Sequence, residues 1–288
     1  MISKRKSRPE REYHRHISAR HKFFKLEPKK ILAYKDLIVF YARKNIVTTY
    51  RQTVLGPIWL VLSPLLNSLI QMFVFGYLAG FKTGGVPKIV FYLFSNTAWQ
   101  LYSYTVNGNS QLLLNNARLF EKVFFPRLTI SYANMLSNVI TTGVQLILSF
   151  CFLLIYWALG EVTPAPTFIL FVIPIALLLM LGQGMGLIYA SLAVRYRDLK
   201  NVFPIVTSVL MYFSPVVYPL SQLGTGALGK ILLLNPFCAI FELFRAFLWN
   251  APYPPLWSII YAVVMAILVD IFGILIFNRV GRNFVDTI

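Results

Sequence analysis

The 288-residue sequence has few acidic residues and few of the groups that enzymes use for chemistry. Only 10 Asp and Glu residues accompany 27 Lys and Arg, and the three histidines, His14, His16 and His21, all lie in a basic N-terminal stretch. Their spacing on a solvated arm disfavours a metal site. Cys151 and Cys238 are predicted at different depths, so no disulfide framework is expected. Without sets of acid, base or metal-ligand residues, an enzyme is the least favoured class of function.

Charge is also missing from long stretches of the sequence. Six stretches exceed the ~20 residues that a helix needs to cross ~30 Å of hydrocarbon, and among them only the stretch that contains Asp270 carries a carboxylate. The predicted fold is therefore an all-α, polytopic membrane protein with six transmembrane helices. The predicted spans cover about residues 56–80, 90–112, 128–158, 168–194, 202–220 and 257–278.

The basic residues are unevenly distributed between the segments that join these spans. Of the 27 Lys and Arg residues, 23 lie in segments 1–51, 118–127, 195–200 and 279–288. Cytoplasmic loops retain Lys and Arg, so these segments and both termini are predicted to be cytoplasmic. The basic N-terminal part could suggest nucleic-acid binding, but it shows no binding motif. Proximity to anionic lipid explains its charge, and no nucleic-acid partner is expected.

The N-terminal part divides into two segments. Residues 1–30 are predicted to form a flexible basic arm. Residues 31–46 place Tyr34, Leu37 and Tyr41 on one face at helical spacing, which predicts an amphipathic helix along the membrane surface. A short helical tether with no such role explains the same pattern.

The segment 220–255 is expected on the outer side and is not simply polar. Its apolar runs 227–234 and 237–249 are too short to span a membrane, and they are read as re-entrant or interfacial half-helices. In the second run, Glu242 and Arg245 lie three residues apart, opposite the apolar face. Interfacial anchoring with no moving part fits this pattern equally well.

Residues 224–231, Gly-Thr-Gly-Ala-Leu-Gly-Lys-Ile, spell GxGxxG and the first seven positions of a phosphate-binding loop. Ile231 stands where such a loop needs the Ser or Thr that reaches Mg²⁺. The predicted topology also places the segment outside, away from cytosolic nucleotide. No nucleotide, cofactor or metal is therefore expected on this chain.

Features within the spans indicate packing more than chemistry. Gly182 and Gly186 are four residues apart with Gly184 between them, a spacing that lets helix backbones approach closely. Asp270 is the one clear intramembrane carboxylate, whereas a proton-coupled transporter usually has several such charges. A hydrogen bond to a neighbouring polar group, or exposure to a wet cavity, is its favoured role, and ion coupling stays an alternative. A chain that moves a solute but has no energy-supplying reaction of its own must obtain the energy from a partner protein or act as a channel.

Two short inner segments, 118–127 and 195–200, combine charges with aromatic residues. Membrane anchoring explains their charges but not the exposed Phe residues that we expect in the first segment. Both segments are therefore predicted to contact a partner.

Four sequence motifs resemble those of a known family. They are YRQTVLGPIW at 50–59 followed by Pro64, NARLFEKVFFPR at 116–127, RYRDL at 195–199 with SPVVYP at 214–219, and NPF at 235–237 with Glu242 and Arg245. Together they resemble the membrane-spanning permease subunit of type-2 ABC exporters, in the polysaccharide group that exports O antigen, capsule and teichoic acid. The resemblance runs from about residue 31 to the C-terminus and implies no role for the arm at 1–30.

The resemblance implies a half-transporter in the cytoplasmic (inner) membrane. Two copies of the chain would form a pore, and two copies of a separate ATPase subunit would hold ATP and Mg²⁺. Residues 31–46 would be the interface helix, 118–126 the coupling helix and 220–255 the outer gate. The implied cargo is a glycan on an undecaprenyl diphosphate carrier, O antigen first among the candidates.

The resemblance also implies roles for individual residues. Contact with the ATPase partner is expected at Tyr41, Arg118, Glu121, Lys122, Phe124, Arg195, Arg197 and Asp198. Spans one and five line the pore in this family, which suggests a substrate channel at Asn67, Gln71, Tyr77, Tyr212, Phe213 and Tyr218. Three alternatives stay open: an ABC permease for a drug or another lipid, an ATPase-independent channel or secondary transporter, and, least favoured, a glycan-transferring membrane enzyme.

Overall fold

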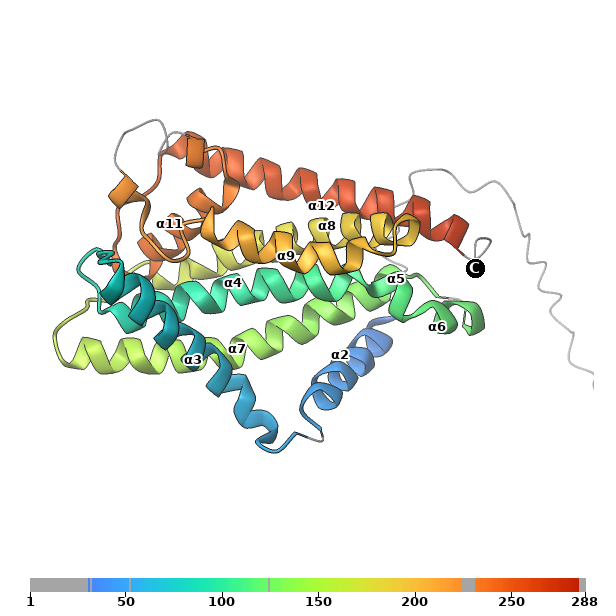
Figure 1. Ribbon diagram of the computed structural model, residues 1–288, viewed down its shortest axis with the longest axis horizontal. Coiled ribbons are helices and arrows are strands. Elements are labelled where there is room, and N and C mark those ends of the chain that lie inside the picture. The colour runs from blue at the N-terminus through green and yellow to red at the C-terminus, as the bar shows by residue number, and fades with distance from the viewer. Residues whose placement is uncertain (1–30, 32, 52, 124, 224–230, 285–288) are drawn as a thin grey trace, which may run out of the picture.

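The computed structural model describes residues 31, 33–51, 53–123, 125–223 and 231–284, and within them it contains helices and no strand (Figure 1). The expected all-α class is thereby confirmed for this part of the chain. The basic arm at 1–30, Phe124 and most of the glycine-rich sequence at 224–231 lie outside the described residues. The helices are α2 (Lys35–Tyr50), α3 (Trp59–Gln71), α4 (Lys88–Ser110), α5 (Leu112–Asn115), α6 (Ala117–Lys122), α7 (Leu128–Ala158), α8 (Val172–Arg195), α9 (Leu199–Tyr212), α11 (Pro236–Trp249) and α12 (Leu256–Phe284).

Four helical segments in the described residues are long and apolar enough to cross a membrane: Gly56–Leu78, Leu128–Ala158, Phe168–Arg195 and Leu256–Gly281. Helix α4 has sufficient length, 23 residues, but it carries polar side chains such as Asn96 and Gln100. Most of α4 is buried inside the bundle, where neighbouring helices rather than lipid meet these side chains. Helix α9 has only 14 residues. Four of the six predicted spans therefore meet the criteria of length and composition.

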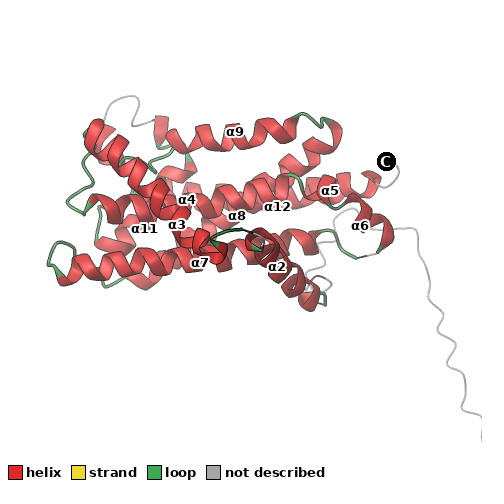
Figure 2. Ribbon diagram, turned by 60° about the horizontal axis from the view of Figure 1, so that its bottom comes forward, coloured by secondary structure: helices red, strands yellow, loops and turns green. Residues whose placement is uncertain are grey.

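The long helices α4, α7, α8 and α12 run side by side along the long axis of the bundle (Figures 1 and 2). Helix α8 lies at the centre and packs extensively against α4 and α12. Helix α6 and the C-terminal end of α12 lie at one end of the bundle, and α11 lies at the other (Figure 1). The described parts of the predicted inner segments 118–127 and 279–288 are thus separated from those of the predicted outer segment 220–255, as the alternation of loops requires.

The glycines of α8 face two different neighbours. A Cβ atom on Gly186 would lie 2.7 Å from the Cβ of Asn109 on α4, and one on Gly182 would also meet α4. A Cβ atom on Gly184 would instead lie 2.6 Å from the Cα of Asp270 on α12. The expected close approach of backbones at these glycines is confirmed, because any larger side chain would push one of the helices away.

Helix α2 covers Lys35–Tyr50, so it starts and ends about one turn later than the predicted 31–46. It packs against α7, while Tyr34 and Leu37 contact a small hydrophobic cluster that includes Phe120 and Phe277. Phe40 on α2 is 63% exposed. The helix is therefore attached to the bundle along one face and offers an apolar residue on another.

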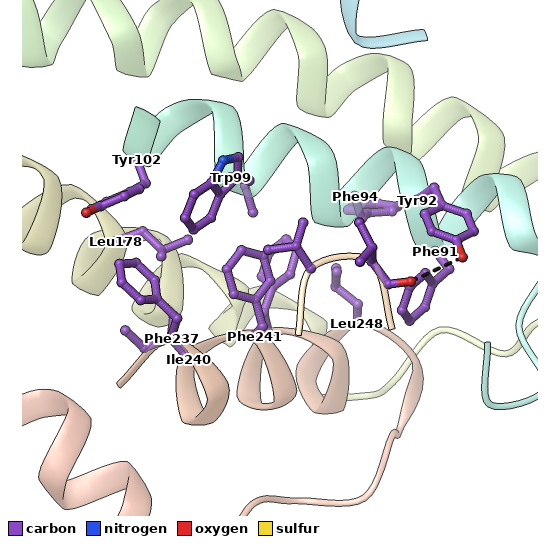
Figure 3. Packing of buried hydrophobic residues seen from close by; sticks show 14 of the residues in the cluster. Phe91, Tyr92, Phe94, Trp99, Tyr102, Leu178, Phe237, Ile240, Phe241 and Leu248 are labelled. Atoms are coloured by element: carbon purple, nitrogen blue, oxygen red, sulfur yellow. Dashed lines mark hydrogen bonds between the residues drawn. The ribbon is translucent and has the colours of Figure 1, made fainter. Parts of the chain in front are cut away.

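Helix α11 differs from a half-solvated surface helix. Every residue from Phe237 to Trp249 is buried, and aromatic side chains of α11 and α4 interlock over its length (Figure 3). Phe237 lies edge-on to Tyr102, with 4.7 Å between ring centroids. The face that carries Glu242 and Arg245 is also buried and packs on the rest of the bundle.

Candidate functional site at the outer end of the bundle

Helix α9 ends at Tyr212, just before the sequence Ser214-Pro-Val-Val-Tyr-Pro219. Proline has no N–H and its ring clashes with a preceding carbonyl, so the helix cannot continue through Pro215 and carbonyl groups near its end lose their helical donors. Residues 214–217 are buried. Buried carbonyl groups without donors are costly, so other parts of the molecule must supply the hydrogen bonds.

Arg245 supplies several of these hydrogen bonds. Its Nη2 donates to the carbonyl of Pro215 and to the carbonyl of Val216 at 3.3 Å, and its Nη1 donates to the carbonyl of Tyr218 at 3.4 Å. Nη2 also donates to Ser95 Oγ on α4 at 3.1 Å. One guanidinium thus connects α11, α4 and the broken end of α9.

The charge of Arg245 is compensated inside the protein. Glu242 Oε1 lies 3.1 Å from Arg245 Nη1 and also accepts a hydrogen bond from the backbone N–H of Leu220 at 2.8 Å. The guanidinium lies over the ring of Phe91 at 4.2 Å. A buried cation needs a paired anion and further hydrogen bonds to be tolerated, and this arrangement provides both. We call Arg245 and Glu242 the outer brace.

Asn235 of the NPF motif makes a second connection between the same elements. Its Oδ1 accepts from the backbone N–H of Phe237 at 3.1 Å and thereby caps α11. Its Nδ2 donates to the carbonyl of Phe213 at 3.0 Å and to Ser214 Oγ at 3.2 Å. The start of α11 is therefore bonded to the end of α9.

Aromatic rings gather next to this brace. The π-helical turn 72–78, which follows α3, places Phe75 6.2 Å from Tyr212 and 6.3 Å from the parallel ring of Phe81. The ring of Phe81 lies 5.8 Å from that of Tyr218, whose hydroxyl donates to the carbonyl of Tyr212 at 3.1 Å. Flat aromatic faces of this kind can stack on sugar rings.

The residues predicted to line a channel are only partly brought together. Gln71 is half-buried and bonds to Met211 at the end of α9, so it joins Tyr212 and Tyr218 in one region. Asn67 and Phe213 are exposed on α3 and after α9. The role of these residues in a channel stays a prediction.

Tyr77 has a different environment. It lines an open cavity of 790 Å³ together with Lys88, Tyr156 and Glu161. Lys88 Nζ lies 4.0 Å above the Tyr77 ring and donates to the carbonyl of Gly76 at 2.6 Å. Tyr77 thus faces the loop before α4 and the end of α7, and its predicted channel role stays a prediction.

At the other end of the bundle, α6 presents the predicted coupling segment. Arg118 and Lys122 are exposed, and Glu121 lies between them in the same helix. Phe124 lies outside the described residues. Arg118 and Lys122 are therefore accessible to a partner.

The neighbouring phenylalanines correct one expectation. Phe120 and Phe125 are buried, with 5.8 Å between ring centroids, and they pack in the cluster that contains Phe277 of α12. The prediction that they are exposed is wrong, because they close the inner end of the hydrophobic core. Arg127 lies over Phe120 at 5.7 Å and bonds to the carbonyl of Gly281, and burial lowers the pKa of its guanidinium.

The second inner cluster agrees better with the sequence pattern. Arg195, Arg197 and Asp198 are exposed, and so is Tyr196, with the guanidinium of Arg195 5.4 Å from its ring. Tyr41 on α2 is half-buried, with Lys44 5.4 Å from its ring. Their contact with an ATPase stays a prediction.

Asp270 faces the helix crossing near Gly184, and one of its carboxylate oxygens, Oδ1, is buried without a hydrogen-bond partner among the described residues. The expected structural hydrogen bond is therefore not found for this atom. No group of three or more metal-ligating side chains occurs in the described part of the chain.

Sequence reasoning missed a series of hydrogen-bonded amide side chains, namely the half-buried Asn45 and Asn134 and the buried Asn109 and Gln183. The available signal was the presence of amides within otherwise apolar spans, where they tend to bond across helices. The role of Arg245 was also missed, because an intrahelical pair with Glu242 looks like a solvated surface pair in the sequence.

Comparison with known proteins gives a consistent result. The profile of the family described as ABC-2 type transporter matches residues 37–249. The chain is 24% identical over 259 residues to the O-antigen export system permease protein RfbA of Klebsiella pneumoniae, covering 87% of this chain and 94% of that protein. It is 27% identical over 203 residues to the polysialic acid transport protein KpsM of Escherichia coli (70% and 77%). It is 24% identical over 228 residues to the capsule polysaccharide export inner-membrane protein CtrC of Neisseria meningitidis (75% and 80%).

Proposed function

Because the chain belongs to the ABC-2 type transporter family, we propose that it is the membrane permease subunit of an ATP-driven polysaccharide exporter. The observation that carries this proposal is the similarity, over most of the chain, to RfbA, KpsM and CtrC, all of which are named for polysaccharide export or transport. Members of this family are transport components rather than enzymes.

The proposed assembly contains two copies of this chain and two copies of a separate ATPase that binds ATP and Mg²⁺. The exposed inner clusters around Arg118 and Arg197 support a cytoplasmic partner. Exposed apolar residues in the π-helical turn after α3 and on α9, including Phe73 and Ile205, are available to a second copy or to lipid.

The proposed topology has six spans in the cytoplasmic membrane, with both termini inside. Helix α4 would be the second span, shielded from lipid by its neighbours, and α9 with the following turn would be the fifth. Helix α11, too short to cross, would enter the membrane from the outer side as part of a gate. The excess of Lys and Arg in the inner segments supports this orientation.

The proposed cargo is a glycan linked to undecaprenyl diphosphate, with O antigen as the first candidate. The aromatic residues Phe75, Tyr212 and Tyr218 would offer stacking faces to the sugars, and the outer brace would hold the end of α9 beside them. A drug or another lipid could use the same fold, and a channel that works without ATPase is the second alternative.

Deletion of the gene tests the proposal. We expect surface glycan to disappear and a lipid-linked glycan to accumulate in the cytoplasmic membrane, and we expect the tagged chain to copurify with a soluble ATPase. Glu121→Arg and Phe124→Ala should leave the protein inserted but uncouple ATP hydrolysis from export. Unchanged export in these variants would refute the coupling role of residues 118–126, and cargo movement by the reconstituted chain alone would favour a channel.

A further inference from the structure

A row of side-chain amides crosses the bundle from α2 to α8. Asn45 Nδ2 on α2 donates to Asn134 Oδ1 on α7 at 2.8 Å. Asn134 Nδ2 donates to Asn109 Oδ1 on α4 at 3.4 Å, and Asn109 Nδ2 donates to Gln183 Oε1 on α8 at 2.9 Å. Each amide donates towards the next helix, so all three bonds run in one direction. We call these four residues the amide chain.

The half of the amide chain nearer to α8 is buried and makes additional hydrogen bonds. Asn109 and Gln183 are buried, and Asn109 Oδ1 also accepts from Ser131 Oγ at 3.0 Å. Asn134 Nδ2 lies 3.3 Å from the carbonyl of Gly108. The bond between Asn109 and Gln183 lies in the buried interior, where successive hydrogen bonds polarise one another and the loss of one weakens its neighbour.

The two ends of the amide chain lie at places of different character. At one end, α2 precedes the first apolar segment and leaves Phe40 and Arg43 exposed. At the other end, Gln183 lies between Gly182 and Gly184, where α8 is in close contact with α4 and α12. The amide chain thus joins an accessible peripheral helix to the most tightly packed seam of the bundle.

We propose that Asn45, Asn134, Asn109 and Gln183 are positioning residues that transmit movement of α2 to α8. A force on α2 either carries α7, α4 and α8 with it or breaks one of the three bonds of the amide chain. Tight packing at the α8 glycines turns a small displacement into a shift of whole helices, because packed interfaces do not deform continuously. The transport role of this linkage rests on the proposed function, whereas the linkage itself does not.

The first experiment measures amide hydrogen exchange of the full chain in lipid nanodiscs, without any ATPase. Leu has the branching of Asn but no polar atoms, so Asn45→Leu, Asn134→Leu and Asn109→Leu each remove bonds of the chain. We expect each to raise exchange in α2 by about three-fold to ten-fold, the effect of one interhelical hydrogen bond in a membrane. The decisive variant is Asn109→Leu, because Asn109 bonds to α7 and α8 and acts on α2 only through Asn134.

Two matched variants serve as controls. Asn138 on α7 donates to Thr105 Oγ1 on α4 at 3.3 Å, one helical turn beyond Asn134 and apart from the amide chain. Thr49 on α2 donates to the carbonyl of Asn45 within the same helix. Asn138→Leu and Thr49→Val should leave exchange in α2 within about two-fold of the wild type. Equal effects of the controls, or no effect of Asn109→Leu on α2, would overturn the proposal.

The second experiment uses the complex with its copurified ATPase. Asn45→Leu and Asn134→Leu should lower the amount of glycan exported per ATP hydrolysed by about three-fold to ten-fold, with assembly unchanged, and the double variant should be no worse than either single variant. Additive losses, or a normal ratio in both single variants, would overturn the transport role. A wild-type complex that exports no glycan would instead refute the proposed function, and the exchange measurement would still decide the linkage.

Discussion

Arg245 and Glu242 form an ion pair inside the protein, with 3.1 Å between Nη1 and Oε1 and only 2% and 11% of their side chains exposed. They lie one turn apart on α11, and each also bonds to the segment after α9. The pair therefore holds two elements together that are distant in the sequence.

Removal of one partner should destabilise this arrangement strongly. Glu242→Ala leaves the guanidinium buried without an anion, and we expect a loss of about 3–5 kcal/mol. Thermal unfolding of the detergent-solubilised protein measures this loss of stability. Glu242→Gln keeps an acceptor for the N–H of Leu220 and should lose less. Wild-type stability of the Ala variant would show that the pair does not hold the outer end.

Two glycines in long helices should respond with opposite signs to substitution by alanine. Gly184→Ala places a methyl group against the α12 backbone, and overpacking costs about 1–3 kcal/mol. A Cβ on Gly143 of α7 meets no atom within 4 Å, so Gly143→Ala should gain about 0.5–1 kcal/mol from helix propensity. The same unfolding assay compares them, and a stable Gly184→Ala protein would contradict the close contact.

Substitution of the aromatic residues at the end of α9 should lower export of the cargo without lowering ATP hydrolysis by the complex. Tyr212→Ala removes a ring beside Phe75, and we expect export to fall while ATP hydrolysis by the complex persists. A nucleic-acid base gains about 1–3 kcal/mol by stacking on an aromatic side chain, and by analogy we expect export of a stacked sugar to fall about ten-fold. Phe272→Ala, which removes an exposed ring from α12, is the control. Equal losses in both variants would argue against a cargo contact at Tyr212.

Thiol labelling tests the proposed orientation. Lys82 and Arg197 are exposed, and they lie on opposite sides of the membrane in the six-span topology. The two proteins to compare carry Lys82→Cys or Arg197→Cys, each together with Cys151→Ser. A membrane-impermeant maleimide should label only the Lys82→Cys protein in intact spheroplasts and both proteins after lysis, because Lys and Arg are retained inside. Labelling of Arg197→Cys in intact spheroplasts would invert the topology.

Patterns that depend only on neighbouring residues were predicted well. The helical class, the packing role of Gly182, Gly184 and Gly186, and the exposed cluster at 195–200 all follow from local periodicity and charge. Predictions about exposure were less successful. Phe120 and Phe125 look available in a charged loop, yet they are buried because α12 supplies Phe277 as a partner.

The sequence by itself determined that this chain is a helical membrane protein, because hydrocarbon accepts long uncharged helices and basic segments stay on the cytoplasmic side. Only the tertiary structure decided which polar groups find partners. The carbonyls freed at Pro215 meet a guanidinium 30 residues later, and Asn45 meets an amide 89 residues away. Burial and hydrogen-bond satisfaction are properties of the packed bundle, so no local pattern could have assigned these contacts.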